Sequence, residues 1–371
     1  MSRPLKGLLV VSLEQAVAAP MCTLRLADAG ARVIKIEREE GETARHYDKA
    51  VHGISAYFAW LNRGKESCVL DLKAVDDLAL VHRMIAKADV FVQNFAPGAT
   101  QRLGLGSKDL VALQPRLIAV DIVGYGQDTE YLHMRAYDML VQAESGLCAV
   151  TGTPEVPSKV GVSVSDIATG MNAQAMVLEA LIERGVTDKG RVIEVAMFDS
   201  IADWMSVPML HLKYGGRTTG RHGLSHASIY PYAPFACKDG DVVISIQNPK
   251  EWQRFCAGVL GDAAIAADAR FHDNPSRLKN RAALDQVILT VFRKMTCAEA
   301  IAKLEANDIA WAKSSTVANA VNHPALRNFP VALHDGTLID VPLPAGREKF
   351  DAGPVPALGE QTQKIRQEFA R

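Results

Sequence analysis

Among the residues of this sequence that could carry chemistry, Asp166 has the most informative position. It follows Ser165 at the predicted start of a long amphipathic helix over residues 167–184. The first N–H groups of a helix have no partner within it, and the helix dipole stabilises a carboxylate there by about 0.3–1 kcal/mol. From the residues alone, Asp166 is therefore either an N-cap or an ionised carboxylate available for nucleophilic chemistry.

A second candidate region lies around residues 213–230, where glycine alternates with basic and small residues. It contains Arg221, His222 and His226. This composition predicts either a flexible linker or a functional loop. The formal net charge of the chain is -1, so a phosphate-bearing ligand would have to be held by local basic groups, and nucleic acid is not an expected partner.

Several motifs are absent from the sequence. There is no nucleotide P-loop, no H-E-x-x-H and no G-x-S-x-G, and Gly104-Leu105-Gly106 lacks the third glycine of a dinucleotide fingerprint. The six cysteines are scattered without a C-x-x-C pair, so neither a metal site nor a tightly bound cofactor is expected. No signal-peptide pattern or membrane-length apolar stretch is recognisable, which predicts a cytoplasmic protein that does not enter a membrane.

The first half of the chain alternates short apolar runs with helical stretches, a pattern that predicts an α/β fold with a buried parallel sheet. The predicted strands cover residues 8–13, 31–37, 89–93, 117–123 and 191–195. The predicted helices cover residues 20–29, 74–86, 167–184 and 198–212. A strand at 242–246 and helices at 249–258 and 281–293 then predict a smaller α+β domain, followed by a largely extended, proline-containing tail.

Several segments, taken together, resemble the class III (CaiB/BaiF) coenzyme A transferases and the related α-methylacyl-CoA racemases. They span nearly the whole chain and comprise residues 4–45, 62–73, 89–98, 102–106, 222–240, 280–281 and 323–326. The resemblance implies a Rossmann-like large domain over 1–200, to which 331–371 returns, a linker over 201–228 and a small domain over 229–330. It also implies an interlocked homodimer, whose stability cannot be separated from its assembly.

The resemblance implies that Asp166 is a covalent nucleophile that accepts CoA from an acyl-CoA and passes it to a carboxylic acid. The segment Val164–Gly170 retains the aspartate, threonine and glycine of the family pattern, but has Ser165 in place of a glycine. The resemblance also implies seven CoA-contacting residues, which are Arg38, Lys73, Asn94, Phe95, Arg102, Arg135 and Tyr137. Their cations would neutralise the phosphates of CoA, although each is by itself equally compatible with a solvated surface position.

Tyr137 separates the two chemistries of the family. Racemases have a histidine before an aspartate in this region, whereas this chain has Ala136-Tyr137-Asp138. An ordinary tyrosine, with a pKa near 10, is a poor base at neutral pH. Transferase is therefore the expected activity, with a racemase or a non-catalytic CoA-binding homologue as the alternatives.

The opening segments are most similar to a subgroup that acts on short dicarboxylates, such as itaconate, mesaconate or citramalate, with succinyl-CoA as donor. A dicarboxylate needs a cation at its far end, and the candidates are Arg45, Arg221, His222 and His226. Two departures from the formyl-CoA transferases argue against oxalate–formate exchange. Val17 replaces a glutamine, and the run Ile246–Pro249 lacks the glycines expected to cover the site.

Overall fold

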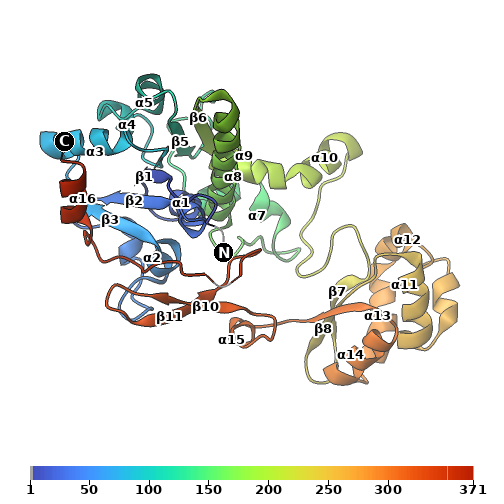
Figure 1. Cartoon of the computed structure of the whole chain (residues 1–371). Helices are drawn as coiled ribbons and strands as arrows, with labels where there is room; N and C mark the ends of the chain where they lie inside the picture. Colours follow the sequence, from blue (N-terminus) through green and yellow to red (C-terminus); the bar gives the residue numbers. More distant parts are fainter. Residues whose placement is uncertain (1–2, 349, 371) are drawn as a thin grey trace. The chain divides into compact units, whose positions relative to one another are not determined.

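The computed structural model describes residues 3–348 and 350–370, which form two compact units (Figure 1). The first unit comprises Met1–Cys148, Lys159–Met209 and Arg327–Arg371. The second comprises Ala149–Ser158 and Leu210–Leu326. The C-terminal segment thus folds with the N-terminal half of the chain.

The first unit is built on a six-stranded sheet in the order β3-β2-β1-β4-β5-β6, with every neighbouring pair parallel. The strands are β1 (Leu9–Leu13), β2 (Arg32–Glu37), β3 (Lys65–Val69), β4 (Val90–Gln93), β5 (Ile118–Val123) and β6 (Val192–Ala196). This is the order of a doubly wound Rossmann-type sheet, in which the chain reverses direction across the sheet between β1 and β4. The predicted α/β class with a parallel sheet is confirmed.

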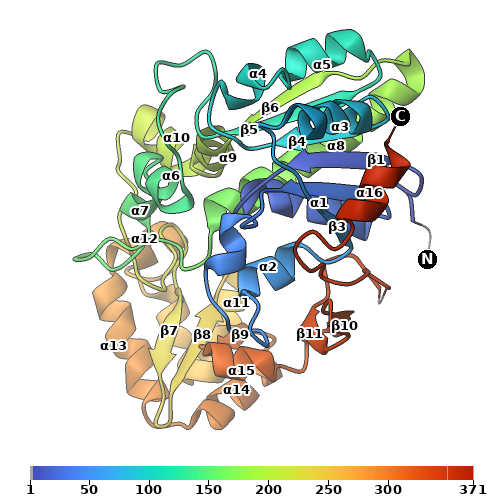
Figure 2. The same cartoon turned by 90° about the vertical axis from the view of Figure 1, so that its left-hand side faces the viewer.

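Helices cover both faces of this sheet (Figure 2). Helices α1 (Ala18–Asp28) and α8 (Val164–Thr187) pack on one face, and α3 (Val75–Ile85), α5 (Ser107–Leu113) and α16 (Thr362–Glu368) pack on the other. The remaining helices of the first unit are η1 (Thr43–His46), α2 (Ala56–Leu61), α4 (Ala99–Arg102), α6 (Asp138–Glu144), α9 (Met197–Trp204) and the beginning of α10 (Ser206–Gly215). A short helix α7 (Leu147–Val150) follows α6, and β10 (Asn328–Ala332) pairs with β11 (Leu338–Pro342) in an antiparallel hairpin.

Five predicted strands of the sheet are present, but the sixth, β3, was not predicted. Its sequence KESCV begins with two charged residues and has no apolar run. The strand is nevertheless buried because Lys65 is ion-paired inside the protein. The single helix predicted over 198–212 is also wrong in detail, since α9 ends before Met205 and α10 begins at Ser206.

The second unit contains an antiparallel sheet of β7 (Tyr232–Ala236), β8 (Asp241–Ser245) and β9 (Ala310–Lys313). Its helices are α11 (Pro249–Arg254), η2 (Phe255–Leu260), η3 (Ala263–Ala267), α12 (Asn274–Lys279), α13 (Arg281–Phe292), α14 (Cys297–Ala306) and α15 (Val317–Val321). Aromatic side chains, including Trp252, Phe255 and Phe292, form a separate core for this unit. Within the described residues, no helix is long and apolar enough to cross a membrane.

Candidate active site

The carboxyl end of the parallel sheet gathers several of the residues singled out in the sequence. Arg38 follows β2, Asn94 and Phe95 follow β4, and Arg135 and Tyr137 lie in the segment after β5. Because all six strands are parallel, these segments leave the same edge of the sheet. In sheets of this type, ligands bind at this edge, next to the point where the strand order reverses.

Asp166 lies in the first turn of α8, which begins at Val164 with Ser163 as N-cap. The predicted start of the helix at residue 167 is therefore wrong, and neither Ser165 nor Asp166 is the N-cap. Asp166 is the third helical residue, a position that still benefits from the positive end of the helix dipole. Its side chain is half-buried.

Two contacts fix the start of α8. The Ser165 amide donates to Oδ1 of Asp138 at 2.8 Å, and Oδ2 of Asp138 accepts from Nε2 of Gln142 at 2.8 Å. One turn further along, Gly170 lies so close to α1 that a Cβ atom there would collide with the Ala18 carbonyl oxygen and lie 2.6 Å from Cβ of Met21. The small residue at 170 thus permits the Asp166 end of α8 to rest on the start of α1.

The carboxyl group of Asp166 has unusual electrostatic surroundings. None of the ion pairs within residues 3–348 and 350–370 includes Asp166. Burial, together with the nearby negative charge of Asp138, raises the pKa of Asp166 to about 7. A carboxylate with a raised pKa is a stronger base and a stronger nucleophile than an ordinary one once it is ionised, and such groups concentrate at functional sites.

One aromatic residue, Tyr47, is close enough to Asp166 to be influenced by its charge. Tyr47 is exposed, but partial desolvation and, to a smaller extent, the charges of Glu42, Asp166 and Tyr137 raise the pKa of its phenol. Tyr47 also packs edge-on against Tyr57, with ring centroids 5.5 Å apart. Asp166 and Tyr137 thus both lie close enough to Tyr47 to influence its pKa, although the three residues come from separate segments of the chain.

Sequence reasoning did not identify Tyr47, Tyr57 or Asp138 as site residues. Tyr47 and Tyr57 lie in a segment, HYDKAVHGISAYFAW, that was recognised only as similar to a subgroup of the family. Asp138 is adjacent to Tyr137 and was used only to tell transferases from racemases. The signal available in the sequence for Asp138 was its position next to Tyr137, which was predicted to contact CoA.

The four predicted phosphate-binding cations are exposed. Arg38 donates from Nε to the Gly41 carbonyl at 2.9 Å and lies 3.8 Å from Glu40. Lys73, Arg102 and Arg135 have no ion-pair partner in the part of the chain that the structure describes. Exposed cations without a protein partner can bind phosphate without first breaking an internal ion pair.

Asn94 instead has a structural role that is visible in its hydrogen bonds. Its Oδ1 accepts from the Gln15 amide at 3.0 Å, and its Nδ2 donates to the Gln15 carbonyl at 2.9 Å. The neighbouring Phe95 packs partly into the core between the sheet and α3. Asn94 therefore fixes the loop that joins β1 to α1, at the point where the strand order reverses.

Two of the four candidate cations for a distal carboxylate are already occupied. Arg45 makes two short hydrogen bonds to Glu37 and lies 3.7 Å over the ring of Phe58. Arg221 donates to the carbonyls of Thr153 and Pro154 within the second unit.

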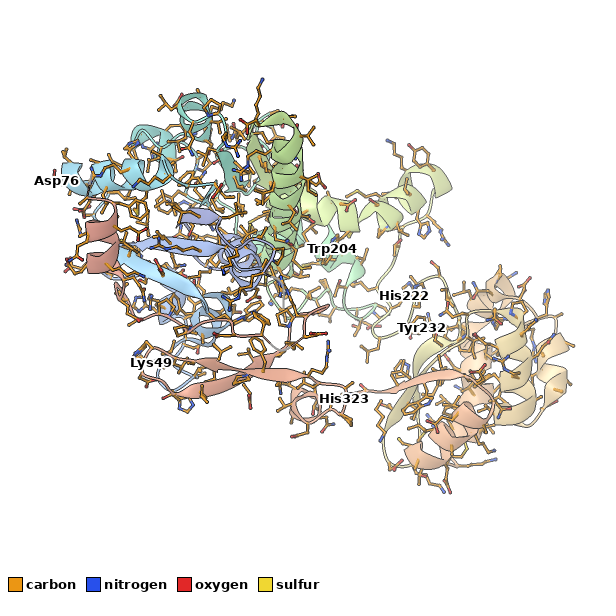
Figure 3. All side chains as sticks on the ribbon, viewed as in Figure 1. Lys49, Asp76, Trp204, His222, Tyr232 and His323 are labelled. Carbon is orange, nitrogen blue, oxygen red and sulfur yellow. The ribbon has the colours of Figure 1, made fainter. Side chains whose placement is uncertain are left out.

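The two histidines lie in the second unit, where Figure 3 labels His222 together with Tyr232. Burial, with nearby Arg281 and His226, lowers the pKa of His222. His226 stacks on Tyr232 with ring centroids 5.4 Å apart. Both histidines retain ring nitrogens that could bind an anion if they became protonated.

A cluster of four buried charges, Glu14, Lys35, Glu42 and Lys65, lies beneath the same edge of the sheet. Lys65 is 2.7 Å and Lys35 is 3.3 Å from the same oxygen of Glu14, and Lys35 is 2.8 Å from Glu42. We call this group the buried charge cluster.

No group of residues suited to hold a metal ion occurs in the described ranges. A cavity of about 360 Å³ between α2 and β11 is lined by His52, Trp60 and Asp340, and not by Asp166.

The chain matches the family model described as CoA-transferase family III over residues 5–362. It is 33% identical to acetyl-CoA:oxalate CoA-transferase of Acetobacter aceti, over 99% of this chain and 96% of that one. It is 31% identical to succinyl-CoA:glutarate CoA-transferase of Mus musculus, over 100% of this chain and 87% of that one. Among solved structures it is similar to a CAIB/BAIF family protein from Brucella suis, with a TM-score of 0.85, 30% identity and full coverage of both chains.

Proposed function

Because this CoA transferase belongs to CoA-transferase family III, we propose that it transfers CoA from succinyl-CoA to a short dicarboxylic acid, with Asp166 as the covalent nucleophile. The main support is the state of Asp166. It is a half-buried carboxylate in the first turn of α8, outside any ion pair of the described residues, with a pKa raised to about 7. Near neutral pH such a group titrates, so the nucleophilic, ionised form is populated.

The proposed reaction conserves the energy of the thioester because water is never the acceptor. The Asp166 carboxylate attacks the thioester carbonyl, the C–S bond breaks, and a mixed anhydride and the CoA thiolate form. The thiolate then attacks the Asp166 carbonyl, which releases the donor acid and leaves an aspartyl–CoA thioester. The acceptor carboxylate attacks this thioester, and the thiolate released attacks the acceptor's acyl carbon. The new acyl-CoA leaves and Asp166 is regenerated.

The residues proposed to bind CoA divide into two groups. Arg38, Lys73, Arg102 and Arg135 provide the cations for its phosphates, supported by their exposure and by the absence of ion-pair partners for the last three within the described ranges. Asn94, Phe95 and Tyr137 form the neighbouring surface at the carboxyl end of the sheet. No tightly bound cofactor is required, because CoA enters and leaves as part of the substrates.

A short dicarboxylate acceptor is supported by the names of two relatives, since oxalate and glutarate both have two carboxylates. Itaconate, mesaconate and citramalate are the proposed acceptors for this chain. Of the four residues considered for the distal carboxylate, Arg45 and Arg221 are held by protein groups, and the lowered pKa of His222 favours its neutral form.

A homodimer with interlocked subunits, located in the cytoplasm, is also part of the proposal. Helix α10 has no buried residue. Together with the end of α9, where Figure 3 labels Trp204, it exposes large apolar side chains that a second subunit could cover. They are Trp204, Val207, Met209, Leu210, Leu212 and Tyr214.

The test is intact-mass spectrometry after incubation with succinyl-CoA, with and without hydroxylamine, on the wild type and on Asp166→Asn. The wild type is expected to gain a CoA or succinyl adduct that hydroxylamine removes, and Asp166→Asn is expected to gain none. Asp199→Asn is the matched control, because Asp199 is also the third residue of its helix, α9, and is exposed. An adduct that persists in Asp166→Asn, or a wild type that binds CoA without forming one, would overturn the assignment of the nucleophile.

A further inference from the structure

Glu42 connects the buried charge cluster to two segments that lie next to Asp166. Its Oε1 accepts from Nζ of Lys35 at 2.8 Å. Its Oε2 accepts from the Ala16 amide at 2.8 Å and from the Ala44 amide at 3.2 Å. The residue is only 5% exposed. One buried carboxylate therefore receives three donors from three different segments.

The first of these segments is the loop Gln15–Val17 between β1 and α1. Ala16 has a φ of 62°, in the left-handed region that costs a residue with a Cβ atom about 1–2 kcal/mol. Asn94 holds the Gln15 side of the turn by two hydrogen bonds, and Glu42 holds the Ala16 amide. The strained conformation thus depends on two side chains from the segments that follow β2 and β4.

This loop determines where α1 begins, and α1 supports the Asp166 end of α8. Val17 is the N-cap of α1, is 2% exposed, and belongs to the same apolar cluster as Ile167, the residue after Asp166. The Ala18 carbonyl lies against Gly170. A change in the Gln15–Val17 loop would therefore move the surface on which Asp166 rests.

The second segment is η1, whose N-cap is Glu42 through its contact with the Ala44 amide. Tyr47 directly follows η1 and is an electrostatic neighbour of Asp166. Glu42 consequently fixes both the loop under Asp166 and the segment that carries Tyr47.

We propose that Glu42 is a positioning residue for the Asp166 nucleophile. It acts by holding the Gln15–Val17 loop in its left-handed turn and η1 in place, with Lys35 neutralising its charge. The inference rests on the proposed function of Asp166. Misplacement of a reacting group by about 1 Å typically costs about 100-fold in rate, so a residue that never touches substrate can have a large effect.

The test compares the rate of CoA-adduct formation in the wild type and in Glu42→Gln. A glutamine has the same shape, but one of its terminal atoms becomes a donor. Because Glu42 faces three donors, the amide places a donor against a donor in either orientation. The adduct is expected to form 10- to 100-fold more slowly, while the KM for succinyl-CoA stays within about twofold.

Asp28→Asn is the control for a general loss of stability. Asp28 is 5% exposed and makes two hydrogen bonds to Arg63, at 3.1 and 2.7 Å, so it is buried and paired like Glu42, but it lies at the far end of α1. Both variants are expected to melt at lower temperature, and only Glu42→Gln is expected to form the adduct slowly. An equal slowing in both variants would overturn the proposal.

A second substitution tests the loop directly. Glycine adopts the left-handed conformation without strain. In a protein that already carries Ala16→Gly, Glu42→Gln should therefore slow adduct formation by less than about half as much as in the wild type, measured as the change in the logarithm of the rate. If Glu42→Gln is recovered unfolded, Ala16→Val strains the same turn with the charges intact, and a 10-fold slowing is again expected. An adduct rate that neither Glu42→Gln nor Ala16→Val changes would overturn this inference but not the proposed function, which fails only if the wild type forms no adduct.

Discussion

Two carboxylates near the same edge of the sheet, Glu14 and Asp166, have opposite electrostatic states. Glu14 is buried and lies within 3.3 Å of both Lys35 and Lys65, and it accepts a hydrogen bond from Thr23. Burial alone would raise its pKa, but the charges of Lys65 and Lys35 outweigh burial and lower the pKa to about 2. Asp166 is less buried, has no cation partner in the described residues, and has its pKa raised to about 7 by burial and by Asp138.

The difference shows that pairing, more than depth, decides what a carboxylate contributes here. A fully paired carboxylate is inert and holds segments together, whereas an unpaired one retains the proton affinity that covalent chemistry needs. The two states also have opposite effects on folding, because the paired group stabilises the native protein when ionised and the unpaired one destabilises it. The following substitutions alter each side of this comparison.

The largest loss of unfolding free energy is expected for Glu14→Gln, which removes the paired charge while keeping the volume of the side chain. Lys35 would retain Glu42, but Lys65 would be left with only the Asn62 side-chain oxygen and the Pro20 carbonyl. Breaking a buried ion pair on one side typically costs about 3–5 kcal/mol. Urea unfolding at pH 7, followed by circular dichroism, would measure the loss.

Glu66→Gln is the control for Glu14→Gln. Glu66 pairs with Arg32 and Lys364 at a partly exposed position, where an ion pair contributes less than about 1 kcal/mol. An equally small loss for Glu14→Gln would show that the buried charge cluster does not stabilise the fold.

The second substitution, Gly170→Ala, displaces Asp166 without changing any charge. The new methyl group would collide with the Ala18 carbonyl and with Met21, so α8 would have to move away from α1. Overpacking of this kind costs about 1–3 kcal/mol, and the rate of adduct formation should fall at least 10-fold.

The matched control for Gly170→Ala is Gly185→Ala, on the same helix. No atom lies within 4 Å of the position that its Cβ would occupy, so this change should stabilise α8 by about 0.5–1 kcal/mol. If the two alanines had the same effect, close packing at residue 170 would not be what places Asp166.

Asp166→Asn should abolish turnover and at the same time stabilise the fold above pH 7. The pKa of Asp166 rises from 3.8 to about 7 on folding, so ionisation destabilises the native state. This cost is absent below pH 3.8, increases as the pH rises, and is complete above pH 7. The side chain is partly exposed, and the gain is therefore limited to about 1–3 kcal/mol.

Thermal unfolding at pH 8 and at pH 4 would measure this gain, which should be present only at pH 8. Asp199→Asn should instead lose about 0.3–1 kcal/mol, because its exposed carboxylate interacts favourably with the helix dipole. A variant Asp166→Asn that is less stable than the wild type at pH 8 would contradict the unpaired state of this carboxylate.

The sequence predicted the framework of the site better than its electrostatics. The strands of the sheet, apart from β3, follow from their apolar runs, and the position of Asp166 follows from the amphipathic pattern of α8. The pairing of Lys65 with Glu14 could not be predicted, because the residues are 51 positions apart and meet only when β3 joins the sheet next to β2. Arg45 was considered as a substrate ligand although it is bound to Glu37, because no sequence pattern marks a pair eight positions apart in the segment after β2.

The start of α8 was misplaced for a similar reason. A helix that begins with Ser165-Asp166 suggests a cap supplied by its own sequence, yet the Ser165 amide is capped by Asp138, which is 27 residues away. Caps from distant segments leave no local pattern. The contact between Asp138 and the start of α8 was consequently beyond the reach of a single sequence.

The smallest effect is expected for Asp138→Asn, which removes the second cause of the raised pKa of Asp166 and leaves the first unchanged. The asparagine oxygen can still accept from the Ser165 amide at the start of α8, while its NH2 group would lose the hydrogen bond from Nε2 of Gln142. Without the negative charge, the pKa of Asp166 should fall. The acid limb of the pH dependence of adduct formation should therefore move from near pH 7 to lower pH. It should remain well above pH 3.8, because burial is the larger cause.

Glu144→Gln, at the other end of α6, is the control for the loss of a negative charge on that helix and should leave the limb in place. If Asp138→Asn also left it in place, burial alone would set the pKa of Asp166. The reactive state of this carboxylate would then depend on the packing around the start of α8 and not on its neighbouring charge.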